Sequence, residues 1–376
     1  MKKSAVLILA FAFLLNLFCP FVKAEFSISA KAAIVIAADT LEVLYEKSAN
    51  KKLPMASTTK IMTALLLAEQ PDLSKTVKTT KQMVTVEGSS MGLLEGDTVS
   101  YRDLLYGMLL ASGNDAANTT AYVLAGSTQG FAKMMNEKAA ELGMKNTSFV
   151  TPSGLDDENH YTTAYDLAVL TAAALENAAF RTACSSKSAV LYYGNPPYRR
   201  TLTNHNKLLG NYDGIIGVKT GFTKKSGRCL VTAAEREGKR VIAVTLNDPD
   251  DWNDHRKLLD YGLEKVLVTE FKNDDIDDVL PIICGSADLI RIKFEQTKIC
   301  TSLDGNNKIK RKIILPKFVY APISAGEKVG RIEYYFKDKL VKTTDAFSVA
   351  DVERYNRKES FQKRFLSNLK VLWNNC

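Results

Sequence analysis

Apolar residues recur along the first part of the chain with the periods of two strands followed by several helices. The runs 32–37 and 41–45 are short and are separated by a polar step, which predicts a β-hairpin. The run 61–68 is apolar on nearly every face and predicts a buried helix. Residues 101–125 predict two helices with a polar break between them, and Asp115 can cap the second.

After these helices the pattern returns to strands. An amphipathic helix over 131–142 is followed by a turn-rich loop at 151–165, and loops of that length often line a site. Another helix starts near Tyr165, and a last one covers 255–264. Three strand candidates lie between those two helices: 215–222, 228–234 and 240–246. The order predicts an α+β domain in which strands from both ends form one antiparallel sheet around an inserted helical region.

From about residue 267 the pattern becomes all-β. Hydrophobic and charged residues alternate over 290–294, which is typical of a half-buried strand. Further short strands are predicted at 313–315, 319 and 329–336. We therefore expect a first domain at 25–266 and a small β-rich domain at 267–350.

The last segment, 351–376, has the pattern of an amphipathic helix. Lysine and arginine occupy its other faces, and its apolar face is formed by Phe361, Phe365, Leu369, Leu372 and Trp373. Such a helix suits a membrane surface, and docking on its own domain is the alternative interpretation.

The N-terminus, 1–24, is typical of a secretory signal peptide. Two lysines precede an apolar stretch that is too short for a confident membrane span, and small residues follow at the cleavage position. We expect the remaining chain to be exported across the cytoplasmic membrane and to work at the membrane or cell wall. Loss of three lysines with this segment lowers the net charge from +8 to +5, a mild basic bias with no stripe of the kind that binds nucleic acid.

The cysteines and histidines suggest neither a disulfide framework nor a metal site. Five cysteines remain after the signal peptide, without a C-x-x-C pair. A bridge between Cys284 and Cys300 and a set of reduced thiols are equally compatible with the pattern. His160, His205 and His255 share no metal-ligand spacing, so a zinc peptidase is disfavoured, and we expect no metal or cofactor.

A serine and a lysine three residues apart, Ser57 and Lys60, stand at the head of the buried 61–68 run. The Ser-x-x-Lys pattern also occurs at three other places in the chain, but those lie in a polar loop and in the charged tail. Residues i and i+3 of a helix share a face, so the Ser57 hydroxyl and the Lys60 amine can meet. Ser57 is then a candidate nucleophile, with Lys60 as its base in the neutral form.

Two later motifs, Ser112-Gly113-Asn114 and Lys219-Thr220-Gly221, supply what the pair lacks. Ser112 and Asn114 would bridge Lys60 and Lys219, and Asn114 would contact the substrate amide. Proximity to Lys219 would lower the pKa of Lys60. The alternative, a charged Lys60 that orients a proton relay through Ser112, stays open.

The strand that carries Lys219 can serve as a binding edge. Lys219 and Thr220 would hold a substrate carboxylate, Gly221 leaves room for close approach, and the strand edge can pair with an extended peptide. The backbone N–H groups of Ser57 and Phe222 would form an oxyanion hole.

Through these motifs the chain resembles the penicillin-recognising serine transferases, and within them the low-molecular-weight D-alanyl-D-alanine carboxypeptidases of the S11 peptidase type. The resemblance also runs through Gly154-Leu155-Asp156, His160 and 163–167, and it covers about 30–265 closely. It implies a β-lactamase/transpeptidase-like fold, a C-terminal β domain with an amphipathic anchor, and no cofactor. The implied activity is removal of the terminal D-alanine from peptidoglycan stem pentapeptides through an acyl-enzyme, with covalent capture of β-lactams.

Three rival functions share part of this pattern. A class A β-lactamase would need a Glu-x-x-Leu-Asn loop, and 151–165 contains only Glu158-Asn159. An endopeptidase that opens cross-links would use the same site with a different groove. An inert peptidoglycan-binding protein would not need the intact set of Ser57, Lys60, Ser112 and Lys219.

Overall fold

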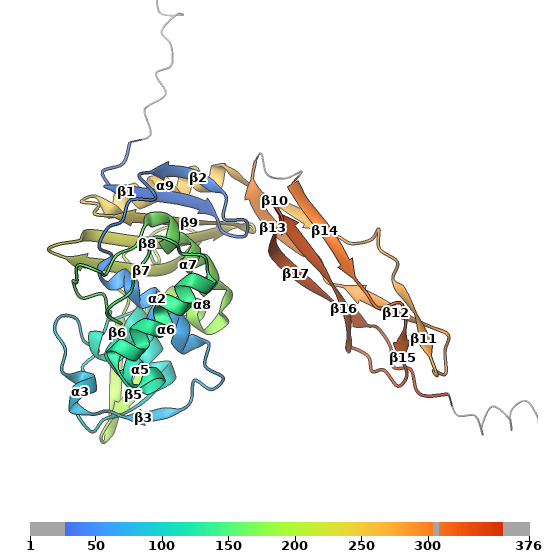
Figure 1. Ribbon diagram of the computed structural model, residues 1–376, viewed down its shortest axis with the longest axis horizontal. Coiled ribbons are helices and arrows are strands. Elements are labelled where there is room, and N and C mark those ends of the chain that lie inside the picture. Colours follow the sequence, from blue (N-terminus) through green and yellow to red (C-terminus); the bar gives the residue numbers. More distant parts are fainter. Residues whose placement is uncertain (1–26, 304–307, 356–376) are drawn as a thin grey trace, which may run out of the picture.

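A five-stranded antiparallel sheet forms the centre of the first domain in a computed structural model that describes residues 27–303 and 308–355 (Figure 1). Its strand order is β2-β1-β9-β8-β7, so the N-terminal hairpin pairs with strands from far later in the chain. The strands are β1 Ala32–Ala37, β2 Val43–Lys47, β7 Ile215–Thr223, β8 Gly227–Arg236 and β9 Lys239–Leu246. This is the predicted antiparallel sheet built from both ends of an α+β domain.

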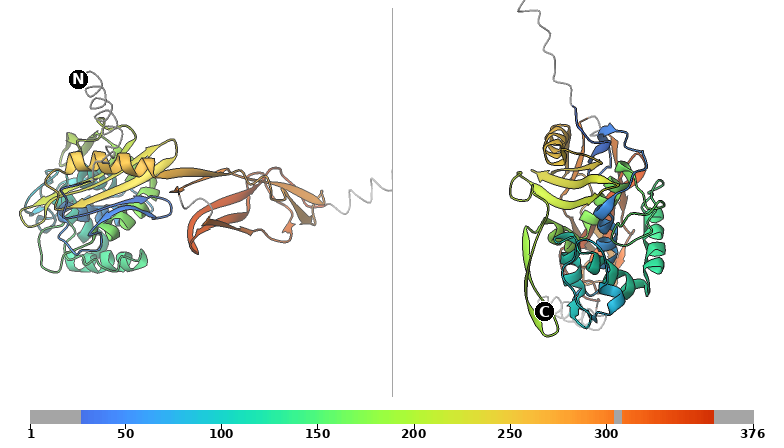
Figure 2. Two further views of the ribbon diagram at one scale, coloured as in Figure 1. Left: turned by 90° about the horizontal axis from the view of Figure 1, so that it is seen from above. Right: turned by 90° about the vertical axis from the view of Figure 1, so that its left-hand side faces the viewer.

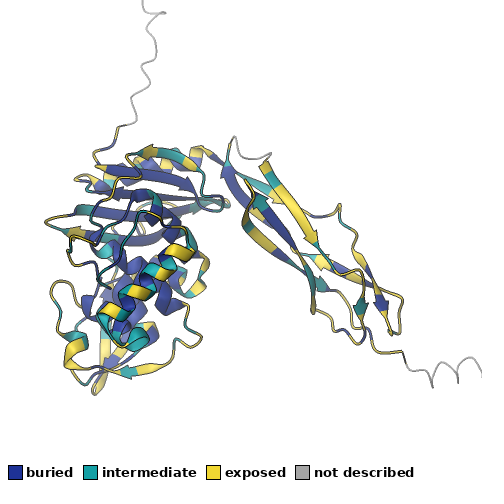
Figure 3. Ribbon diagram, viewed as in Figure 1, coloured by how far each residue is buried: buried dark blue, intermediate teal, exposed yellow. Residues whose placement is uncertain are grey.

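Helices cover both faces of this sheet, which explains why β1 is buried along its whole length (Figure 3). Ile34 and Ile36 pack into the core on the side of the inserted helices, while Val35 and Ala37 face the core under α9. A strand that is covered on both sides carries a continuous apolar run instead of alternation. The helices are η1 Ala56–Thr59, α2 Lys60–Ala68, α3 Lys81–Val84, α4 Tyr101–Leu109, α5 Asn114–Ala125, α6 Thr128–Glu141, α7 Ala164–Glu176, α8 Ala178–Ser185 and α9 Asp251–Glu264.

A second, four-stranded sheet lies beside the inserted helices, with the order β3-β4-β5-β6. Its strands are β3 Thr76–Lys78, β4 Thr98–Ser100, β5 Ser188–Gly194 and β6 Pro197–Thr203. The hairpin of β5 and β6 was not predicted from the sequence. It reaches the loop between α3 and β4, which lines the site described below.

The C-terminal region is all-β and extends away from the first domain (Figures 1 and 2). β10 and β13 form a two-stranded sheet next to the first domain, and six strands continue from it in the order β14-β16-β17-β12-β11-β15. The strands are β10 Val266–Phe271, β11 Val279–Ile283, β12 Leu289–Phe294, β13 Thr297–Ser302, β14 Ile309–Ile314, β15 Val319–Tyr320, β16 Lys328–Phe336 and β17 Lys339–Ser348. The predicted strands are present, and β10, β11, β13 and β17 are additional.

Carboxylates after β1 join the two regions. Asp39 accepts a hydrogen bond from the backbone N–H of Cys300 at 2.8 Å, and Glu42 accepts from the N–H of Ser302 at 2.9 Å. Arg240 donates to Asp39 at 2.7 Å and so fixes that carboxylate from the other side. The joint therefore includes charge-assisted bonds to backbone groups of β13.

One prediction from the sequence is wrong, and two others concern segments that the structure does not describe. Cys284 is exposed, Cys300 is buried, and both are free, so the proposed bridge between them is wrong. The predicted signal peptide and most of the predicted amphipathic tail lie outside the described residues. Within the described ranges, no helix is long and apolar enough to cross a membrane.

Candidate active site

Ser57 lies on a tight turn and not in the first turn of the buried α-helix, as the sequence analysis expected. Residues Ala56–Thr59 form one 3₁₀ turn, and the α-helix begins at Lys60. Residues three apart eclipse each other in a 3₁₀ turn, which places Lys60 directly beside Ser57. The Lys60 Nζ atom lies 2.9 Å from the Ser57 Oγ atom.

The Lys60 amine is fully buried and touches three oxygen atoms. Besides Ser57, it donates to Asn114 Oδ1 at 2.6 Å and to the Ser153 carbonyl at 2.8 Å. The orientation of the Asn114 amide is fixed, because its nitrogen donates to the Glu87 carbonyl at 2.5 Å. Burial lowers the pKa of Lys60 well below its ordinary value, and the charge of Lys219 lowers it further.

Lys219 is the second buried amine of the site. Its Nζ donates to Ser112 Oγ at 3.0 Å and to the Thr220 carbonyl at 2.7 Å. Burial lowers its pKa to about 7. Ser112 reaches Lys219 from a residue with a φ of 57°, a left-handed conformation at the break between α4 and α5. The predicted bridge is thus divided: Ser112 contacts Lys219, and Asn114 contacts Lys60.

β7 is the edge strand of the central sheet and borders a cleft of about 340 Å³. A Cβ atom on Gly221 would lie 3.1 Å from the backbone nitrogen of Ser57, so glycine lets the strand approach the 3₁₀ turn closely. Phe222 is 66 % exposed at the rim. The cleft is lined by Ser57, Ser89, Ser112, His205, Lys207, Thr220, Gly221, Phe222, Arg228, Asp251 and Trp252.

The turn-rich loop at 151–165 packs against the 3₁₀ turn that carries Ser57. The His160 Nε2 atom lies 2.7 Å from Thr59 Oγ1, while its Nδ1 accepts from the Val150 N–H at 2.9 Å. Gly154 has a φ of +88°, and a Cβ atom there would overlap the Ala56 carbonyl oxygen. The loop therefore positions both the 3₁₀ turn and, through the Ser153 carbonyl, the Lys60 amine.

Asp115 performs a different task from the helix cap that the sequence suggested. The α5 helix begins after Gly113, and the buried Asp115 carboxylate accepts hydrogen bonds from the loop before β4. Its donors are the Ser90 hydroxyl and the backbone N–H groups of Met91, Gly92 and Leu93, besides the N–H of Ala116. The same loop carries Glu87 and Ser89, whose carbonyl groups accept hydrogen bonds from Asn114. Asp115 therefore fixes the loop that positions Asn114.

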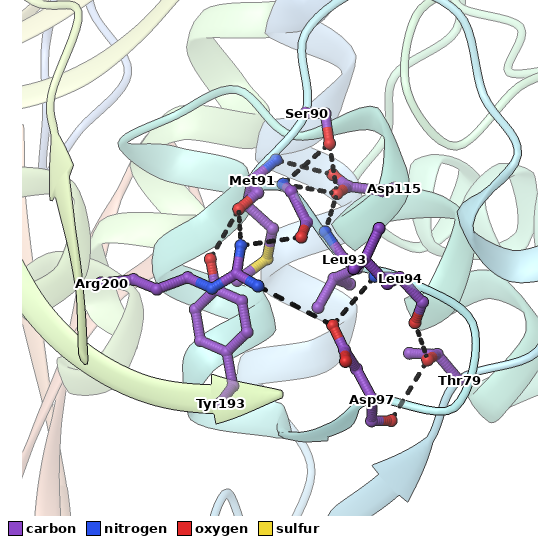
Figure 4. A network of polar contacts seen from close by, with 10 residues as sticks. Thr79, Ser90, Met91, Leu93, Leu94, Asp97, Asp115, Tyr193 and Arg200 are labelled. Carbon is purple, nitrogen blue, oxygen red and sulfur yellow. Dashed lines mark hydrogen bonds and ion pairs between the residues drawn. The ribbon is translucent and has the colours of Figure 1, made fainter. Parts of the chain in front are cut away.

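Arg200 fixes the same loop from the β5–β6 hairpin (Figure 4). Its guanidinium donates to the Gly92 carbonyl at 2.7 Å and lies 4.4 Å and 4.1 Å from the ring centres of Tyr193 and Tyr198. Tyr193 donates to the Met91 carbonyl at 2.6 Å. No local sequence pattern links the hairpin to the loop, so these residues were not predicted.

Comparisons with known proteins identify the family of this chain. The profile of the D-alanyl-D-alanine carboxypeptidases, peptidase family S11, matches residues 20–250. The chain belongs to this family. The profile of the penicillin-binding protein 5 C-terminal domain matches residues 294–354 of the same S11 chain.

Relatives of this S11 chain extend the likeness over both domains. D-alanyl-D-alanine carboxypeptidase DacF of Bacillus subtilis is 33% identical over 82% of this chain and 82% of its own length. D-alanyl-D-alanine carboxypeptidase DacC of Escherichia coli is 30% identical over 87% and 85%. The solved structure of the Streptomyces K15 DD-transpeptidase is 33% identical, with a TM-score of 0.60 over 63% of this chain and 98% of that one. DacD from Francisella tularensis, 24% identical with a TM-score of 0.62, shares the fold over 88% of this chain and 95% of its own.

Proposed function

We propose that this chain is a serine D-alanyl-D-alanine carboxypeptidase that removes the terminal D-alanine from peptidoglycan stem pentapeptides and is acylated by β-lactams at the same serine. The observation that carries the assignment is the buried Lys60 amine within 2.9 Å of the Ser57 hydroxyl.

The contacts of Lys60 favour its role as a neutral base. A neutral amine has two N–H donors and one lone pair. The Asn114 Oδ1 atom and the Ser153 carbonyl oxygen can only accept, so they take the two N–H donors and leave the lone pair for the Ser57 hydroxyl. Burial, which lowers the pKa of Lys60, favours the same protonation state.

The proposed reaction follows from this geometry. Ser57 Oγ attacks the carbonyl carbon of the penultimate residue, and its proton passes to Lys60. The N–H groups of Ser57 and Phe222 stabilise the oxyanion, and removal of one such donor typically costs about 10²- to 10³-fold in turnover. The C–N bond then breaks, the leaving amine takes a proton, and water hydrolyses the Ser57 ester.

We place the substrate along β7. An extended peptide pairs with this edge strand, and its terminal carboxylate meets Lys219 and the Thr220 hydroxyl. The cationic side chains of Lys207 and Arg228, which also line the cleft, suit an anionic ligand, although Arg228 is paired with Asp251 at 2.9 Å.

Two measurements test the assignment. Labelled penicillin should attach to Ser57, and label that persists in Ser57→Ala would refute the nucleophile. The purified protein should liberate D-alanine from a pentapeptide that ends in D-Ala-D-Ala. Opening of cross-linked dimers without release of D-alanine would instead identify an endopeptidase, and rapid penicillin turnover would identify a β-lactamase.

A second candidate, transfer of the acyl group to an amine, is favoured by the 33% identity to a protein named DD-transpeptidase. The same acyl-enzyme would then be attacked by an amine in place of water. A pentapeptide assay with and without an added amino acceptor separates the two, because transfer yields a new amide at the expense of the hydrolysed tetrapeptide.

We further propose that residues 1–24 direct export and that 351–376 attach the chain to the outer surface of the cytoplasmic membrane. The amphipathic pattern of the tail supports the attachment. Truncation after residue 350 should release the protein from membranes, and unchanged partitioning would contradict the anchor.

A further inference from the structure

An exposed apolar face lies at the end of the β-rich region that is farthest from the first domain, where Figure 1 shows β11, β12 and β15. Pro281 on β11 pairs with Leu289 on β12, and Ile283 on β11 pairs with Tyr320 on β15. Paired residues of neighbouring strands point to the same side of a sheet. Phe318 joins this side, because its ring contacts that of Tyr320 at 5.4 Å. We call these five residues the tip face.

The tip face is the solvent side of a sheet whose other side is already buried. Leu289 is 56 %, Tyr320 65 % and Phe318 41 % exposed. The alternate residues of the same strands, such as Ile282 and Ile290, form the core of this end of the domain. A sheet with one side in solvent usually carries polar side chains on that side, so this face departs from the expected alternation.

The tip face lies next to the start of the C-terminal segment. Tyr355, the last described residue, donates its N–H to the Cys284 carbonyl at 2.8 Å, and Ser286 donates to the Glu353 carbonyl at 2.8 Å. The last described residues of the chain therefore lie beside the turn between β11 and β12. The 21 residues that follow carry the amphipathic pattern, so the tip face and the proposed anchor start from the same place.

The charges around the tip face are mixed. Lys317 precedes Phe318, and Arg291 and Lys293 follow Leu289 on the outward side of β12, while Asp288 lies in the turn. The attraction of this surface therefore comes from its apolar side chains, and the cations beside it suit anionic lipid headgroups.

We propose that the tip face enters the interfacial layer of a lipid bilayer and acts as a second attachment point beside the C-terminal segment. This inference rests on the proposed membrane location. One weak attachment gives marginal, reversible membrane binding, and two give stable binding. Tyrosine favours the interface, because one end of its ring is apolar and the other carries a hydroxyl group that stays in water.

A pair of matched double variants tests the proposal in the chain from residue 25 to 376. Leu289→Ser/Tyr320→Ser removes two side chains of the tip face, and Leu340→Ser/Tyr192→Ser removes the same residue types from exposed positions elsewhere. Binding to vesicles of phosphatidylglycerol and phosphatidylethanolamine, measured by sedimentation, should weaken at least about tenfold in the tip variant, because two large side chains no longer become buried, and should stay unchanged in the control. Penicillin acylation should be equal in all three proteins.

The natural thiol of Cys284 reports insertion directly. It is the exposed cysteine of the four that the structure describes, so with Cys376→Ser a polarity-sensitive dye labels it selectively. Its emission should shift to the blue on addition of vesicles, while a dye on Leu340→Cys in a Cys284→Ser/Cys376→Ser background should not shift.

The outcomes separate the two proposals. If the parent chain does not sediment with vesicles, the membrane location fails and this inference fails with it. If the parent sediments and the tip variant binds equally well, or both double variants weaken alike, this inference alone is overturned. Stronger binding by the tip variant would also overturn it and would identify the C-terminal segment as the group that covers the face.

Discussion

Acidification is expected to destabilise the protein through His160, whose two ring nitrogens are both engaged in the folded state. Nδ1 accepts from the backbone N–H of Val150, so the proton of the neutral ring lies on Nε2 and points to Thr59 Oγ1. A second proton would convert Nδ1 into a donor that faces another donor. The folded state therefore favours the neutral ring, which is 3 % exposed.

The size of the effect follows from the shifted pKa. Burial lowers the pKa of His160 from 6.5 to about 4. The unfolded chain takes up the proton below its own, higher pKa, whereas the folded state does so only near pH 4. Stability is therefore lost as the pH falls between those values. At pH 4.5 the loss due to this ring is about 2.5 kcal/mol, because each pKa unit corresponds to about 1.4 kcal/mol.

Urea unfolding at pH 7 and pH 4.5 measures this loss. His160→Gln is expected to be less stable than the parent at pH 7, but its further loss between the two pH values should be smaller by about 2.5 kcal/mol. His205→Gln is the matched control, since His205 is exposed and its replacement should leave most of the pH dependence unchanged. An equal pH-dependent loss in the parent and in His160→Gln would refute the reasoning.

Three further predictions concern the site. The kcat/KM for penicillin acylation should rise with pH as Lys60 loses its proton and fall near pH 7 as Lys219 loses its own. Lys219→Arg keeps its charge at this pH, so the variant should lack the falling limb near pH 7, whatever its overall rate. Arg200→Gln should slow acylation about tenfold by loosening the loop that holds the asparagine beside Lys60, and an unchanged rate with an unchanged melting temperature would contradict that role. Gly154→Ala should cost at least about 2 kcal/mol in thermal unfolding, and more than Gly143→Ala, which has a similar φ but open space around its Cβ position.

The central sheet and its helices could be predicted because their burial leaves local patterns. The continuous apolar run of β1 and the mostly apolar sequence of α2 indicate packing on both sides, and the i to i+3 spacing predicts that Ser57 and Lys60 meet. The 3₁₀ turn at Ser57 could not be predicted, because a 3₁₀ turn and the first turn of an α-helix both bring residues i and i+3 together.

Other contacts of the site depend on residues far apart in the sequence. Arg200 and Gly92 meet through the hairpin of β5 and β6. The burial of β5 alternates, but its exposed residues Val190 and Tyr192 are apolar like the buried ones, so the sequence shows no alternation of apolar and polar residues. The carboxylate of Asp115 could equally have capped its own helix, and only the tertiary position of the 90–93 loop decides otherwise. Long-range geometry of this kind is not contained in any local pattern.

The joint made by Asp39 and Glu42 turns the β-rich region into a spacer of defined reach. β17 alone has ten residues, which at about 3.3 Å per residue spans about 33 Å. For a chain attached at its far end, as proposed above, that span sets the height at which the cleft meets its polymer. Removal of D-alanine would then be confined to a thin layer of the wall at that height. Replacement of Asp39 and Glu42 would let the cleft move over a wider range of heights, without altering the chemistry at Ser57.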